Sequence, residues 1–100
     1  MLTGKQRRHL RALAHELRPL VQIGKAGIDD GLVAAIDRAL TDHELIKVKV
    51  SDAAGVDRHD AAADLATRTQ SEIAQVLGHT LLLYRPHPEE PTIVLPEATS

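Results

Sequence analysis

A glycine-bounded loop between a short apolar run and a helix start constrains this fold most. Residues 20–31 read LVQIGKAGIDDG. The run LVQI favours a short buried strand, although four residues do not settle the element type by themselves. Asp29 is a typical N-cap residue, so a helix is predicted from Asp30 to about residue 41. A strand that turns at once into a helix indicates an α/β fold.

The loop itself consists of Gly24, Lys25, Ala26 and Gly27. Glycine tolerates positive φ and lets a ligand come close to the main chain. N–H groups exposed before a helix favour phosphate, and KH-type modules clamp a nucleic-acid backbone with a Gly-x-x-Gly loop. A strand-to-helix turn also needs glycine for structural reasons, so the loop alone leaves both interpretations open. The two acidic residues at the helix start compete with a phosphate, so an anion is expected nearer Lys25.

The remaining chain alternates between helical and strand patterns. A helix is predicted over residues 3–17, with Thr3 and Gln6 as a capping box. Strict alternation predicts a strand over residues 44–51, with Lys47 and Lys49 on its polar side. The further predicted elements are a loop at 51–57, a helix at 58–77 ended by Gly78, a strand at 79–85 and a last edge strand at 92–95. The order α-β-α-β-α-β-β predicts a two-layer α/β sandwich with a four-stranded mixed sheet.

The first predicted helix has an apolar and a basic side. Its buried stripe, at the i, i+3, i+4, i+7 spacing, comprises Leu10, Leu13, Ala14 and Leu17. The basic residues fall elsewhere on the helical wheel and are expected to face solvent. They are Lys5, Arg7, Arg8, Arg11 and His15.

Charge is divided unevenly along the chain. Residues 1–28 hold six bases and one acid, a net charge of +5, whereas residues 29–100 hold six bases and thirteen acids, a net charge of −7. A basic end suggests contact with a polyanion. A solvated helix face is the alternative, since basic N-terminal helices are common.

Composition excludes several functions. Tyr84 is the single aromatic residue, which argues against stacking platforms for bases. The chain has no cysteine, so thiol catalysis and cysteine-based zinc sites are excluded. No run reaches the ~18 apolar residues of a membrane span, and no signal peptide is evident, so a cytoplasmic protein without membrane contact is expected.

Catalytic and metal-binding motifs are not recognisable. The six histidines show no HxxxH or HExxH spacing, and surface positions explain them better than a metal site. A GxSxG nucleophile motif and P-loop spacing are both missing. We therefore expect no enzyme, no catalytic residues, no bound metal and no cofactor.

Four segments in order resemble a known family. They are RRHLRALAHELRP, VQIGKAGIDDGLVAAID, HELIKVKV and GHTLLLYR. Together they resemble the bacterial YhbY-type proteins, which consist of a single CRM (chloroplast RNA splicing and ribosome maturation) domain, over nearly all of residues 3–95. The resemblance implies a fold similar to the C-terminal domain of the third bacterial initiation factor with a KH-like loop. A length of 100 residues predicts one domain, placed over residues 1–96, and the terminal position of residues 97–100 predicts a frayed tail.

The resemblance also implies a function. The chain is expected to be a cytoplasmic monomer that binds RNA of the precursor large ribosomal subunit and assists its assembly. The RNA-binding positions implied are Gly24, Lys25, Ala26, Gly27, Lys5, Arg7, Arg8, Arg11, Lys47 and Lys49, and the family's LYR ending falls on Tyr84 and Arg85. The acidic C-terminal tail departs from the family pattern, which places a tail contact with RNA in doubt. The competing hypothesis is a protein-interaction module that docks a basic ribosomal protein through Asp52, Asp57, Asp60 and Asp64.

Overall fold

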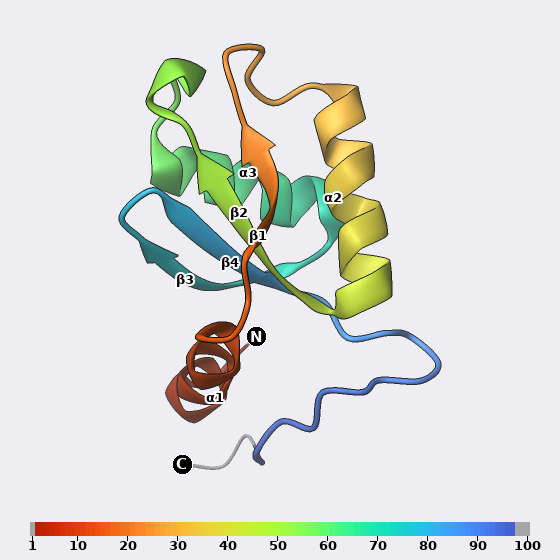
Figure 1. The fold of residues 1–100 in the computed structure, drawn as a ribbon. Coiled ribbons are helices and arrows are strands. Elements are labelled where there is room, and N and C mark those ends of the chain that lie inside the picture. Colours follow the sequence, from red (N-terminus) through yellow and green to blue (C-terminus); the bar gives the residue numbers. More distant parts are fainter. Residues whose placement is uncertain (1, 98–100) are drawn as a thin grey trace.

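A four-stranded mixed sheet forms the centre of the molecule (Figure 1). A computed structural model describes residues 2–97. Along the chain the elements are α1 (Gly4–Ala14), β1 (Pro19–Ile23), α2 (Asp30–His43), β2 (Leu45–Val50), the 3₁₀ turn η1 (Asp52–Ala54), α3 (Arg58–Thr69), β3 (Glu72–Leu77) and β4 (Thr80–Tyr84). In space the strands follow the order β1-β2-β4-β3, with β1 and β2 parallel and the other pairs antiparallel. The predicted α/β class and four-stranded mixed sheet are confirmed, whereas the last two strands lie at residues 72–77 and 80–84 instead of 79–85 and 92–95.

The main core lies between the sheet and the helices α2 and α3. Alternate residues of each strand enter it, among them Ile46, Val48, Leu81 and Leu83, all fully buried. Helix α2 contributes Ile36 and Leu40 to this core, and the small residues of α3 allow close packing. These two layers are the predicted sandwich.

Helix α1 covers only one end of the opposite sheet face. Leu10 and Ala14 pack there against Leu82 and Tyr84 in a second, smaller core. Thr3 and Gln6 form the predicted capping box. The helix ends at Ala14 rather than at residue 17, and Leu13, expected in the buried stripe, is 40% exposed. The rest of this sheet face remains open.

The predicted helix over residues 58–77 is wrong in its second half. Helix α3 ends at Thr69, because Gln70 adopts a left-handed conformation with φ +55°. Strand β3 follows, and the bulge between Ile73 and Gln75 shifts its alternation. Ile73 and Val76 therefore face the same core although they are three residues apart, a spacing that imitates a helix. Gly78 does not end a helix but turns the β3–β4 hairpin with φ +57°.

The predicted edge strand at residues 92–95 is also wrong, because a buried carboxylate binds this segment. Glu44 is 3% exposed and accepts hydrogen bonds from the N–H groups of His87 (2.7 Å), Thr92 (2.8 Å) and Ile93 (3.0 Å), and from the hydroxyl of Thr92. These donors are therefore not free to pair with a strand. Pro96 is tied to α1 through the side chain of Gln6 (3.1 Å). Of the predicted frayed tail, residues 98–100 lie outside the described residues.

Arg85 joins β4 to the helices α2 and α3. Its guanidinium donates to Oδ1 and the carbonyl of Asp37 (2.6 and 2.9 Å), to the hydroxyl of Thr41 (2.9 Å) and to the carbonyl of Thr69 (2.7 Å). It therefore connects the end of β4 to α2 and to the end of α3. Tyr84, 4% exposed, lies in the second core, where burial and the nearby Glu44 charge raise its pKa. Both residues of the LYR ending serve the fold.

The Glu44 carboxylate predicts a defined acid sensitivity. Burial opposes its charge, but the hydrogen bonds from Thr92, His87 and Ile93 outweigh burial and lower its pKa from 4.5 to about 2. Because the folded pKa lies below the unfolded one, the stabilisation is complete above about pH 4.5 and is lost as the pH falls toward 2. Glu44→Gln should reduce the free energy of unfolding near pH 7 by about 3 kcal/mol, measured by urea denaturation.

Glu90→Gln is the matched control, since Glu90 is exposed in the same segment. The control should retain wild-type stability and its fall below about pH 4.5, whereas Glu44→Gln should flatten that fall. Equal acid profiles for the two variants would contradict the role of Glu44.

Arg85→Lys should destabilise the fold although the charge is kept. A lysine ammonium cannot reproduce the planar fork that contacts α2 and α3 at once, so a loss of roughly 1–3 kcal/mol is expected by denaturation. Arg68→Lys is the control, because Arg68 forms only an exposed i, i+4 pair with Asp64 (2.9 Å) and should cost about 0.5 kcal/mol or less. Similar losses of stability in both variants would contradict the role of Arg85 in connecting β4 to α2 and α3.

Candidate nucleic-acid interface

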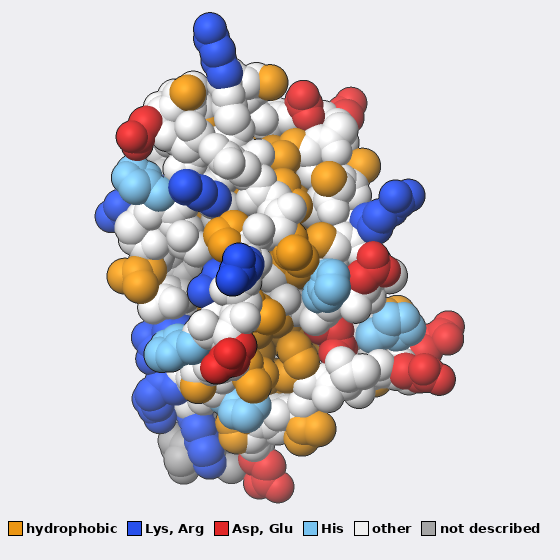
Figure 2. All heavy atoms as spheres, viewed as in Figure 1, with side chains coloured by type: hydrophobic (Ala, Val, Ile, Leu, Met, Phe, Trp, Pro, Cys, Tyr) orange, Lys and Arg blue, Asp and Glu red, His pale blue; other side chains and the backbone are white. Residues whose placement is uncertain are grey.

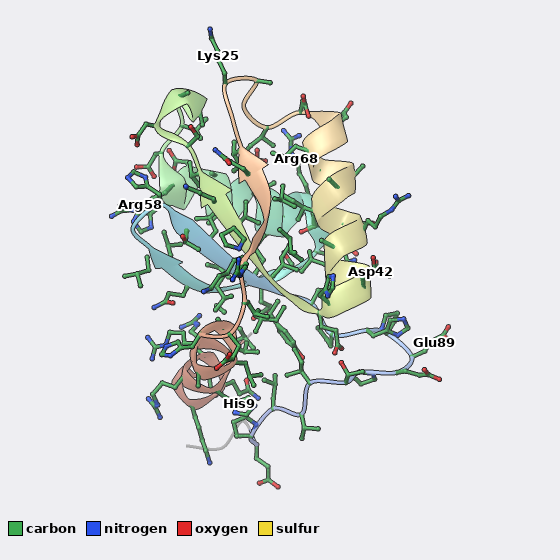
Figure 3. The ribbon with its side chains drawn as sticks, viewed as in Figure 1. His9, Lys25, Asp42, Arg58, Arg68 and Glu89 are labelled. Carbon is green, nitrogen blue, oxygen red and sulfur yellow. The ribbon has the colours of Figure 1, made fainter. Side chains whose placement is uncertain are left out.

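The Gly24–Gly27 loop is a tight turn with open space in front of it. The N–H of Gly27 donates to the carbonyl of Gly24 (2.9 Å), and Gly27 adopts φ +71°. A Cβ added at either glycine would meet nothing within 4 Å. Within residues 2–97, the N–H groups of Lys25 and Ala26 make no hydrogen bond, and Lys25 projects away from the molecule (Figure 3). The turn therefore offers unused donors and a cation at its tip.

An N–H group in the first turn of α2 already donates a hydrogen bond to a side chain of the protein. Oδ1 of Asp29 accepts from the N–H of Leu32 at 2.8 Å, which confirms the predicted N-cap. Asp30 adds a second negative charge to the first turn. An anion at this loop would therefore meet the turn around Lys25 rather than the helix axis.

The strand lysines lie on the open sheet face. Residues across β1, β2, β4 and β3 form a row in which Gln22, Lys49, Thr80 and Leu77 are successive neighbours. A second row contains Lys47, Leu82 and Gln75. Lys49 is exposed, whereas Nζ of Lys47 donates to the carbonyl of Leu17 (3.1 Å) and thereby holds the end of the α1 segment on the sheet. Lys47 thus has a structural role besides its charge.

The basic residues of α1 lie at the other end of the open face from the loop. Lys5, Arg7, Arg8 and Arg11 are all exposed, as predicted. Strand β1 separates the loop from the start of the sheet near α1, and its five residues span about 17 Å. Figure 3 places Lys25 at one end of the molecule and His9 of α1 at the other. The structure therefore brings Arg11 and Lys47 together but keeps Lys25 apart, so the predicted residues line a face rather than a single pocket.

The arginines and lysines divide into two groups. Arg68 and Arg85 form ion pairs with Asp64 and Asp37. The second group makes no ion pair within the described residues, although Arg58 and Lys47 donate to the carbonyls of Gly78 and Leu17: Lys5, Arg7, Arg8, Arg11, Arg18, Lys25, Arg38, Lys47, Lys49 and Arg58. In Figure 2 basic side chains extend from the loop across the sheet to α1, and acidic side chains lie mainly toward the margins.

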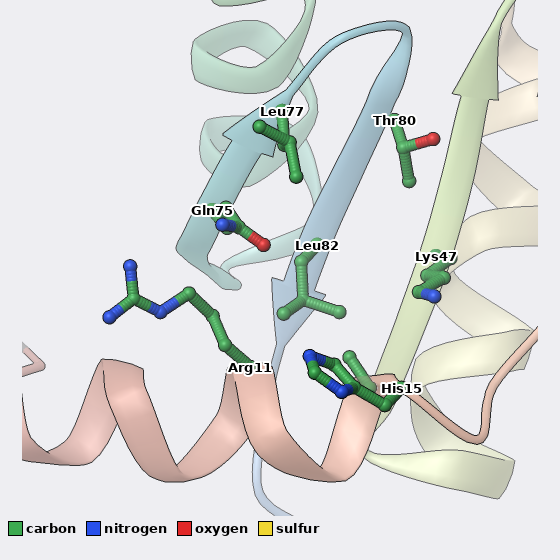
Figure 4. A pocket seen from close by; sticks show the side chains of 8 residues that line it. Arg11, His15, Lys47, Gln75, Leu77, Thr80 and Leu82 are labelled. Carbon is green, nitrogen blue, oxygen red and sulfur yellow. The ribbon is translucent and has the colours of Figure 1, made fainter.

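Three further residues belong to this face. Gln22 neighbours Lys49 in the sheet, Arg18 is exposed between α1 and β1, and His15 lies beside Lys47 (Figure 4). Arg18 was visible in the sequence as part of the basic N-terminal segment. His15 was expected on the solvent-facing side of the first helix, whereas Gln22 gave no signal, because only the strand register brings it to the face.

The acidic residues of the competing hypothesis are largely used within the chain. Asp57 caps α3 by accepting from the N–H groups of Asp60 (3.1 Å) and His59 (2.8 Å), and these bonds lower its pKa. Asp64 pairs with Arg68 at 2.9 Å, and Asp52 lies 3.6 Å from His79. Asp57 and Asp64 thus stabilise α3, whereas the Asp52 side chain is 91% exposed and the carboxylate of Asp60 makes no hydrogen bond or ion pair within residues 2–97.

Two further properties of residues 2–97 bear on the site. No three histidine, aspartate or glutamate side chains in this part of the chain are grouped to hold a metal ion. None of the helices described there has the length and apolar character needed to cross a membrane.

Comparisons with known proteins identify a family for the chain. The model of the CRS1 / YhbY (CRM) domain matches residues 2–85. The Bacillus subtilis protein named "Probable RNA-binding protein YqeI" is 43% identical over 96 residues, covering 96% of this chain and 100% of that protein. A Haemophilus influenzae protein named "RNA-binding protein" is 42% identical over 95 residues, covering 95% of each.

A solved structure is similar over the same length. The solution structure of the hypothetical protein SAV1595 from Staphylococcus aureus matches with a TM-score of 0.80 at 44% identity, covering 96% of this chain and 100% of that one. The sequence and the fold thus agree along almost the entire chain. The chain therefore belongs to the CRS1 / YhbY (CRM) domain family.

Proposed function

We propose that the chain binds RNA along the open basic face. The observation that carries this proposal is the set of cations without an ion-pair partner among the described residues, from Lys25 across Lys49 to Arg11. Their charge is available to a polyanion, whereas Arg85 is engaged in joining β4 to α2 and α3. The names of the relatives and the family match support the same function.

In this proposal the two ends of the face contact different parts of one RNA. At the loop, a phosphate oxygen accepts from the free N–H groups of Lys25 and Ala26, while the Lys25 ammonium adds charge. Gly24 and Gly27 let the sugar-phosphate approach the main chain. At the other end Arg7, Arg8 and Arg11 contact further phosphates, and Lys47 and Lys49 lie between. Because the chain lacks aromatic platforms, contacts of this kind give little sequence discrimination.

The target we propose is ribosomal RNA of the precursor large subunit, with a role for the protein in assembly as a cytoplasmic monomer. This part of the proposal rests on the resemblance to the YhbY-type proteins. Structured ribosomal RNA supplies specificity by shape, which suits a protein that reads backbone more than bases. The acidic-face alternative has less support, since Asp57 and Asp64 are engaged in α3.

The salt dependence of RNA affinity tests the proposed face. With four to six phosphate contacts, log K for single-stranded RNA should fall against log salt with a slope of about −3 to −4. Replacing Lys25 and Arg8 together by alanine should make this slope shallower by about 1.4, since each lost phosphate contact contributes ~0.7. The measurement is a salt titration of binding to a large-subunit ribosomal RNA fragment, with a small-subunit fragment of equal length as comparison.

Arg38→Ala is the matched control, because Arg38 is an exposed, unpaired base on α2, outside the open face. It should leave the slope nearly unchanged. A slope that responds equally to both variants would overturn the proposed face, and equal affinity for the two fragments would overturn the large-subunit target alone.

A substitution at Gly24 tests whether the RNA backbone comes close to the main chain of the loop. Gly24 has ordinary φ and open space at its Cβ position, so Gly24→Ala should fold normally. If RNA backbone contacts this glycine, the added methyl group should weaken binding roughly three- to tenfold without changing the salt slope. Filter binding and a thermal melt of the same variant provide the two readouts. Gly27 is less suitable, since its φ of +71° would add backbone strain.

Gly31→Ala serves as the control for this test. Gly31 lies in the first turn of α2, and its Cβ would make only an ordinary contact of 3.5 Å with Oδ1 of Asp29. This variant should bind RNA as the wild type does. Undiminished binding by folded Gly24→Ala would show that RNA does not approach the loop closely.

A further inference from the structure

A hollow of about 370 Å³ lies on the open sheet face beside α1 (Figure 4). Helix α1 forms one wall, and strands β2, β4 and β3 form the floor. The volume falls at the lower end of the ~300–1,000 Å³ typical of small-molecule sites. The lining residues are Arg11, Ala14, His15, Lys47, Gln75, Leu77, Thr80 and Leu82.

The floor of the hollow is apolar, and part of it is unusually exposed. Leu82 in the floor and Ala14 at the foot of the α1 wall are 2% and 4% exposed, so they form a buried apolar base. Leu77 is 67% exposed although it is a large hydrophobic residue in a strand. A flat apolar ring that packed over this exposed leucine and the neighbouring floor would remove apolar surface from water.

Unused polar groups surround this floor. Within residues 2–97, neither the side-chain amide of Gln75 nor the hydroxyl of Thr80 makes a hydrogen bond. An amide provides both donors and an acceptor, so it can pair with the polar edge of a ring. Arg11 and Lys47 provide positive charge at the rim, and no ion pair within the described residues compensates either of them.

We propose that the hollow takes one unpaired nucleobase of the RNA bound along this face, an inference that rests on the proposed function. A nucleotide combines a flat apolar ring, a hydrogen-bonding edge and a phosphate, and these match the floor, Gln75 with Thr80, and the cationic rim. A base within a duplex presents only its edge, because stacking hides its faces. The hollow therefore selects single-stranded or bulged RNA, by an aliphatic surface instead of an aromatic platform.

Ring-current shifts provide a direct test. The methyl groups of Leu77 and Leu82 in the full chain are labelled with ¹³C and titrated with a short single-stranded oligoadenylate. Tyr84 is 4% exposed in the second core, and the imidazole of His15 is a second ring that lines the hollow. An upfield shift of these methyl groups that requires the bases of the RNA therefore reports a nucleobase over the floor. The same oligomer with abasic nucleotides should bind through its phosphates without this shift.

Leu77→Ser tests how much the apolar floor of the hollow contributes to the affinity for single-stranded RNA. It should weaken oligoadenylate binding roughly three- to tenfold, leave the salt slope unchanged and leave duplex RNA binding unaffected. Leu20→Ser is the matched control: Leu20 is 53% exposed on the opposite edge strand and does not line the hollow. Gln75→Leu should reduce single-strand affinity roughly two- to tenfold, because the base edge loses its partner.

The outcomes separate the two proposals. If wild type binds neither oligoadenylate nor ribosomal RNA, the proposed function itself fails. If it binds with a steep salt slope but without upfield shifts, and Leu77→Ser binds like Leu20→Ser, RNA binding stands and the nucleobase site is overturned. Upfield shifts lost with abasic RNA, together with a selective defect in Leu77→Ser, support the site.

Discussion

The buried Glu44 carboxylate determines how the two sides of this small protein fit together. Glu44 follows α2 with φ +65°, a conformation that is rare for a residue with a side chain. Its N–H donates to Leu40 and its carbonyl accepts from Arg85, so the backbone joins α2 to the end of β4 (both 2.8 Å). Its carboxylate binds the segment from His87 to Ile93, which carries apolar residues onto the second core beside α1. The segment held by the Glu44 carboxylate thus adds Ile93 and Leu95 to the core on which the basic helix packs.

This arrangement explains how a chain of net charge −2 can present a surface for a polyanion. A potential at a binding face depends on which charges are locally compensated, and much less on the overall sum. Four of the acids are compensated locally: Asp29 and Asp57 cap helices, and Asp64 and Asp37 pair with Arg68 and Arg85. Cations on the open face have no such partner among the described residues. The fold therefore separates charges that the sequence only partly separates.

Local signals predicted most of the fold, and their failures have physical causes. Caps at Thr3 and Asp29 and the alternation in β2 depend on neighbouring residues, so the sequence alone was sufficient for them. Strand β3 was missed because its bulge gives apolar residues a helix-like spacing. The absence of the predicted strand at residues 92–95 depends on Glu44, which lies 48 residues before Thr92. The site followed the same rule: the loop and basic helix were predictable, whereas Gln75 and Thr80 meet α1 only through the sheet register.

The shortage of aromatic residues then has a consequence for recognition. The affinity that comes from lysine or arginine contacts with phosphate falls as the salt concentration rises and depends little on RNA sequence. The affinity that comes from contacts at an apolar floor does not depend on salt in this way. A face that combines both should keep its preference for unpaired bases when salt weakens its overall affinity. Because the hollow lies beside α1 and the loop lies at the far end of β1, a bound RNA must also extend along the sheet to use both. In the proposed mode of binding, selectivity comes from the shape and strandedness of the RNA, with one unpaired base in the hollow as an added determinant.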